Sequence, residues 1–172
     1  MKMSVALVAG LLLVPAAGAS AQGVDDAQIA SIVVTANQVD IDAGKLASAM
    51  GSNAEVKKFG QQMATDHAGV NAQAVELVTK LKVTPKDNPT SMSLKEGGAT
   101  NVASLKKLKG AAFDKAYIDH EVAYHQQVLD AVDKTLIPSA SNAELKALLV
   151  KVRPAFVAHL EHAKMVQSSM TK

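Results

Sequence analysis

The chain of 172 residues contains no cysteine and no tryptophan, and aromatic residues make up only 3% of it. Without cysteine it can form no disulfide and offers no thiol for lipid attachment after an export signal. The few aromatic side chains leave little with which to stack nucleic-acid bases. Hydrophobic residues nowhere follow the two-residue period of a half-buried β-strand. The sequence therefore predicts an all-helical protein.

A surplus of positive charge is also lacking. Lys and Arg number 18 against 16 Asp and Glu, and removal of Lys2 with the N-terminal segment leaves 17 against 16, a net charge of about +1. Proteins that grip nucleic acid need cations that neutralise several phosphates. We therefore expect no nucleic-acid partner, and the sequence identifies neither a protein partner nor a small ligand.

The N-terminal segment has the pattern of a secretory signal peptide. Lys2 precedes an apolar run over residues 4–14, and Ala19-Ser20-Ala21 is a small-residue cleavage site. A transmembrane anchor is disfavoured because the run is much shorter than the roughly 20 residues that a spanning helix needs. Residues 1–21 are thus a predicted signal peptide, and residues 22–172 form one exported, periplasmic domain without a transmembrane anchor.

Hydrophobic residues at spacings of three and four predict four long helices. They run over residues 25–50, 52–84 and 112–136, and from about residue 141 to the C-terminus. Residues 86–110 contain Asn88-Pro89 and Gly97-Gly98, which are helix breakers. We expect this segment to cross the bundle between helices two and three as one or two short helical turns. Four helices joined mostly by short loops are typical of an antiparallel bundle.

Three histidines interrupt the apolar stripes of these helices. His67, His125 and His159 each occupy a core position near the middle of a helix. The midpoints of up-and-down helices share one layer, so the three imidazoles can converge. Glu121 lies one turn before His125, and the first helix offers Asp40 or Asp42 at a similar depth. Burial of such groups is unfavourable unless they are paired.

Imidazoles and carboxylates that face inward from separate helices are the way in which bundles hold metal ions. Neutral imidazole suits zinc, copper, iron and nickel alike, so we expect a transition metal, iron, copper or zinc, without a choice among them. Glu121 and His125 are four residues apart, whereas the di-iron motif has three, and that favours a binding protein over an oxidase. His162 is a less favoured ligand, and Asp66 points about 100° away from His67 and is predicted to be a surface group.

Two other interpretations stay open. The polar residues can form a metal-free, hydrogen-bonded layer that sets the register of the helices in a structural or protein-interaction module of the cell envelope. They can also line a substrate pocket. Of the three roles, the substrate pocket is the least favoured.

Several short motifs together resemble one protein family. They are Ala36–Ala47, Val56-Lys57-Lys58-Phe59 with Met63 and Asp66-His67, Leu105–Gly110, Phe113–Tyr117, His125, and His159-Leu160. They resemble a large family of exported bacterial proteins of unknown function, often labelled predicted outer-membrane proteins. The resemblance implies a ferritin-like four-helix bundle, export and association with the outer membrane, and it implies no activity.

The first motif departs from that family. Relatives usually have two glutamates where this chain has Asp40 and Asp42. The shorter side chains predict that a carboxylate from the first helix stands back from the bundle axis. The leading hypothesis is a periplasmic binding or stress-related protein whose layer of His67, Glu121, His125 and His159 holds a metal ion.

Overall fold

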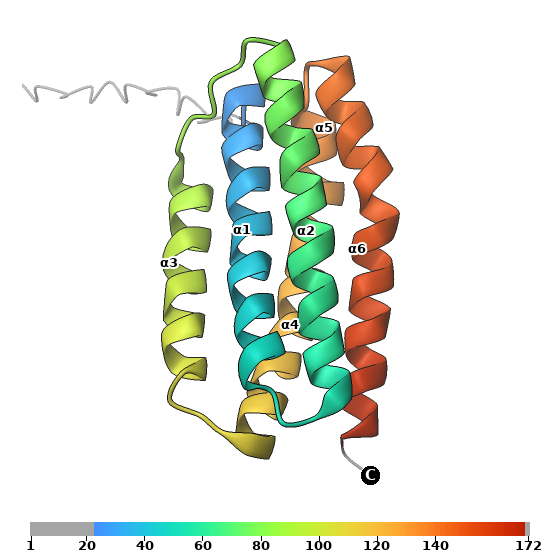
Figure 1. Ribbon diagram of the computed structural model, residues 1–172. Helices are drawn as coiled ribbons and strands as arrows, with labels where there is room; N and C mark the ends of the chain where they lie inside the picture. Colours follow the sequence, from blue (N-terminus) through green and yellow to red (C-terminus); the bar gives the residue numbers. More distant parts are fainter. Residues whose placement is uncertain (1–22, 171–172) are drawn as a thin grey trace, which may run out of the picture.

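Helices account for nearly all of residues 23–170, the part of the chain that the computed structural model describes (Figure 1). The long helices are α1 (Asp26–Met50), α2 (Ala54–Lys80), α3 (Pro89–Leu105), α4 (Gly110–Ala131) and α6 (Ala143–Ser169). A π-helix, η1 (Val132–Leu136), and a short helix, α5 (Ile137–Ser139), follow α4. Residues 23–170 contain no strand, so the all-helical prediction is confirmed. The predicted signal peptide over residues 1–21 lies outside the described residues.

Four of the long helices close a ring. α1 packs against α2, α2 against α6, α6 against α4, and α4 against α1. The colours in Figure 1 show that each of them runs opposite to its neighbours in this ring. The long helix α3 lies outside the ring, alongside α1. None of the described helices is long and apolar enough to span a membrane.

The segment between α2 and α4 differs from the sequence prediction of one or two short turns lying across the bundle. It is a single helix of 17 residues alongside α1. Asn88 caps its N-terminus together with Ser91, and Pro89 fits the first turn, where no N–H is needed. Gly98 does not break the helix: a Cβ atom there would lie 2.6 Å from a methyl carbon of Val39. The glycine therefore lets α3 lie close to α1.

Backbone contact joins α1 to α2. A Cβ atom on Gly44 would lie 2.6 Å from the carbonyl oxygen of Gly60, and one on Gly60 would lie 2.7 Å from that of Gly44. At the end of the same helix pair, Asp114 of α4 accepts hydrogen bonds from the backbone N–H groups of Ser52 and Asn53 and from the Ser52 hydroxyl. These contacts fix how α1 and α2 lie against each other.

The hydrophobic core consists of two clusters. One is formed at one end of the bundle by residues such as Ile32, Val70, Leu129 and Leu149. The other is formed at the opposite end by residues such as Phe59, Met63, Phe113 and Ala163. Near the junction of the two clusters, all four helices of the ring carry buried polar side chains: Asp40, His67, Glu121, His125 and His159.

Candidate metal centre

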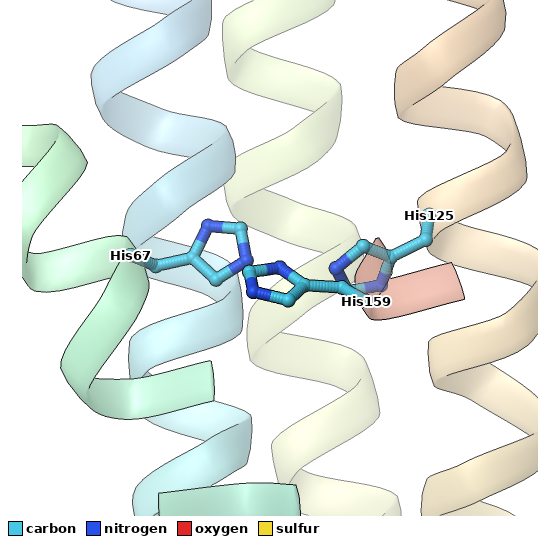
Figure 2. A group of neighbouring side chains, drawn as sticks. All are labelled: His67, His125 and His159. Carbon is cyan, nitrogen blue, oxygen red and sulfur yellow. The ribbon is translucent and has the colours of Figure 1, made fainter. Parts of the chain in front are cut away.

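Three imidazole rings meet in the layer between the two clusters. His67 comes from α2, His125 from α4 and His159 from α6, and each is at most 3% exposed. The ring centroids are 5.6 Å apart for His67 and His125, 5.2 Å for His67 and His159, and 5.5 Å for His125 and His159. Figure 2 shows the rings turned toward one another. One nitrogen from each ring lies within 4.8 Å of those from the other two.

The remaining ring nitrogens are bound to hydrogen-bond acceptors. His67 Nδ1 lies 2.7 Å from Asn37 Oδ1, and the Asn37 amide is oriented by its own N–H donation to the carbonyl of Val33 at 2.9 Å. His125 Nδ1 lies 3.0 Å from the backbone carbonyl oxygen of Glu121. Each of these partners can only accept, so both Nδ1 atoms carry the proton.

His159 uses its other nitrogen in the same way. Its Nε2 lies 3.0 Å from a carboxylate oxygen of Asp66, whose side chain is 43% exposed. Asp66 therefore lies at the surface, as predicted, and it also contacts His159. It connects α2 to α6 and leaves the Nδ1 lone pair of His159 directed to the interior.

The inner nitrogens are His67 Nε2, His125 Nε2 and His159 Nδ1. All three are buried and have no hydrogen-bond partner among the described residues. Since the outer nitrogens carry the protons, three lone pairs face a common space. An uncompensated arrangement of this kind is unfavourable, and a cation bound between the rings relieves it.

Asp40 and Glu121 form a carboxyl pair beside the histidines. Asp40 Oδ2 lies 3.5 Å from His67 Nε2, and Glu121 Oε2 lies 3.5 Å from His125 Nδ1. Burial raises the pKa of Asp40, with further contributions from the Glu121 charge and a hydrogen bond to it, and burial raises the pKa of Glu121 to about 8. Burial therefore favours the protonated form of this pair.

Burial acts on the histidines in the opposite direction. It lowers the pKa of His67 to about 2 and that of His125 to about 4, and nearby imidazoles contribute to both shifts. It also lowers the pKa of His159, partly offset by Asp66. All three rings are therefore neutral at pH 7, which is the form that binds a metal ion.

The Asp40 carboxylate of α1 reaches the centre although its side chain is shorter than that of glutamate. Asp40 is 2% exposed and groups with Glu121 and His125 within ligand distance, contrary to the expectation that a shorter side chain stands back. Gly44, one turn away, explains this, because it lets α1 approach α2 to backbone contact. Asp42 instead accepts a hydrogen bond from Gln38 and is exposed.

The structure does not bring His162 to the three rings. Its Nδ1 lies 3.1 Å from Gln62 Oε1, and its ring packs on the edge of Phe59. Sequence reasoning missed Asn37 and Asp66 as partners of the histidines. Asn37 lies one turn before Asp40, and that spacing is the one sequence signal that it faces the same layer.

Comparison with known proteins identifies a family over most of the chain. The sequence model described as "Domain of unknown function (DUF4142)" matches residues 13–166. No curated protein and no solved structure matches the chain.

Proposed function

The chain belongs to the family defined by the domain of unknown function DUF4142, and we propose that it is a metal-binding protein whose His67, His125 and His159 hold one transition metal ion. The observation that carries this proposal is the set of three inward lone pairs with protonated outer nitrogens. Histidine ligands of metal ions characteristically donate the other ring N–H to a carboxylate or a carbonyl. Here an amide, a backbone carbonyl and a carboxylate supply those three acceptors.

A metal-free hydrogen-bonded layer would use the same atoms differently. Its purpose would be to pair buried polar groups, because each unpaired group costs about 1 to 3 kcal/mol. The three inner nitrogens have no such partner among the described residues. A bound cation satisfies the nitrogens at once, and the Asp40–Glu121 pair provides two negative charges to balance a divalent ion.

The ligand set favours a single ion. Two groups of residues could hold a metal ion in the described part of the chain, and both of them require His125. Because both groups include His125, they adjoin each other, and we propose that one ion binds there. Three imidazoles with carboxylates beside them suit iron, copper or zinc. We propose a role in binding and assign no reaction to this centre.

Metal analysis of protein prepared without an affinity tag tests the proposal. We expect close to one equivalent of iron, copper or zinc, which a chelator removes and added metal restores. Replacing His125 by leucine should abolish this binding, and His162→Leu is the matched control because His162 lies outside the centre. With metal at 100 times its dissociation constant, wild-type protein should gain about 2.7 kcal/mol of stability. If His125→Leu and His162→Leu bind the same amount of metal, the centre is not these histidines.

The cellular location belongs to the same proposal. The pattern of residues 1–21 supports export to the periplasm, with association with the outer membrane as the family resemblance implies. Mass analysis of the exported protein should give an N-terminus at Gln22. A mature chain that keeps residues 1–21 would overturn the export part of the proposal. The ring of α1, α2, α6 and α4, with α3 in the long connection, supports a ferritin-like bundle.

A further inference from the structure

A cavity of about 90 Å³ lies on one side of the candidate metal centre. Its inner end is lined by Asp40 and His67, and each of these residues has a buried polar atom without a hydrogen-bond partner among the described residues. Toward the solvent it is lined by Thr90 of α3 and Gln127 of α4, which are both exposed. The cavity thus connects the edge of the bundle to the centre.

Between these ends the walls are apolar. Buried aliphatic side chains of α1, η1 and α6 line the cavity, among them Ile32, Val132, Leu136 and Leu149. Phe156 also lines it and stacks on the His67 ring, with the centroids 5.4 Å apart and the planes 5° from parallel. A buried water needs two to four polar partners. The aliphatic side chains in the middle of the cavity offer no polar partner, so this part of the cavity disfavours water.

The π-helix η1 contributes two of these wall residues, Val132 and Leu136. The N–H of Ile137 donates to the carbonyl of Val132, five residues earlier. Pro138 follows, and in an α-helix its ring would clash with the carbonyl of Lys134. The wider π winding relieves that clash. Single π turns within helices occur frequently at functional sites, and here the π turn forms the wall of the cavity that ends at the histidines.

We propose that this cavity binds a small, uncharged and mainly apolar molecule, smaller than benzene, next to the metal ion. The role of this molecule next to the metal ion rests on the proposed function. Its binding to the protein rests on the cavity alone. The size limit follows from volume, because an apolar cavity of about 150 Å³ holds benzene. The charge limit follows from the aliphatic walls, since an ion could not leave water to enter them. A dissolved gas fits both limits.

Xenon is a suitable probe, because it is apolar, inert and smaller than benzene. In methyl-labelled, metal-free protein, increasing xenon pressure should shift the NMR signals of Ile32, Val132 and Leu136 in a saturable manner. Ala131 lines the cavity, and replacing it by leucine should weaken xenon binding about tenfold or more. Ala123→Leu is the matched control: the same change on an exposed position of α4 should leave the binding unchanged.

A second variant covers the case in which Ala131→Leu does not fold. Leu136→Ala enlarges the cavity and should increase the xenon-induced shifts of the Ile32 and Val132 methyl signals at a given xenon pressure. The proposal is overturned if wild-type protein shows no saturable shifts, or if Ala131→Leu and Ala123→Leu respond equally. Because the protein is metal-free in these measurements, a negative result would leave metal binding by the histidines unaffected. Conversely, a failure to bind metal would leave the xenon result standing.

Discussion

Replacing Glu121 by glutamine should change how the stability of the metal-free protein depends on pH. Burial raises the pKa of Glu121 from 4.5 to about 8 in the folded chain. Such a group contributes stability that is fully present below the unfolded value of 4.5 and is lost as the pH rises through 8. Each pH unit in between is worth about 1.4 kcal/mol. From pH 8 down to pH 5, this carboxyl group therefore adds between about 3 and 4 kcal/mol.

His67 and His125 act in the opposite direction over the same range. Burial lowers their folded pKa values to about 2 and about 4, from an unfolded value of 6.5. Their contribution is present above 6.5 and is lost as the pH falls toward the folded values. At pH 5 each has lost about 2 kcal/mol, or about 4 kcal/mol together. The gain from Glu121 is therefore about as large as the loss from these two histidines.

The Glu121→Gln variant removes the gain and keeps the loss. We expect this difference in urea unfolding at pH 8, 7, 6 and 5. Between pH 8 and pH 5, the free energy of unfolding of the variant should fall relative to that of wild type by about 3 kcal/mol or more. Glu76→Gln, on the exposed face of α2, serves as the control and should follow wild type. A difference between wild type and Glu121→Gln that stays constant within about 1 kcal/mol from pH 8 to 5 would refute the assignment of a raised pKa to this carboxyl.

Three further substitutions test contacts that position the helices and the histidines. Gly44→Ala should lower the free energy of unfolding by about 2 kcal/mol or more in urea denaturation, because the added methyl group meets the backbone of α2. Gly69→Ala, in open space on α2, is the control and should raise the free energy of unfolding by up to about 1 kcal/mol. Asp66→Ala should weaken metal binding between about 10-fold and 100-fold in a competition titration, since His159 loses the acceptor that orients it. Asp114→Ala should cost about 2 kcal/mol in thermal or urea unfolding, because the loop between α1 and α2 loses three hydrogen bonds.

The positions of α1, α2, α4 and α6 and the convergence of three histidines could be predicted from sequence. Both depend on periodicity: His67, His125 and His159 occupy core positions near helix midpoints, and antiparallel helices bring their midpoints together. The fate of Gly97-Gly98 could not be predicted in this way. Whether Gly98 ends a helix or permits close packing depends on Val39, which belongs to another helix.

The partners of the histidines were also beyond sequence reasoning. Asn37 lies 30 residues from His67, and Asp66 lies 93 residues from His159, so both contacts depend on how separate helices face each other. Asp40 illustrates the same point. The length of its side chain alone predicted a carboxylate away from the bundle axis. The distance between α1 and α2, which Gly44 and Gly60 set, instead places the carboxylate beside the histidines.

The contact between Gly44 and Gly60 has a genetic consequence. A side chain added at either position meets a carbonyl oxygen of the other, and every amino acid has that oxygen. No change at position 60 can therefore compensate for a change at position 44, nor can a change at 44 compensate for one at 60. In a suppressor selection, revertants of Gly44→Ala should restore the glycine or alter residues that hold the two helices together elsewhere. The pair should thus behave as two independently intolerant positions, although the residues touch.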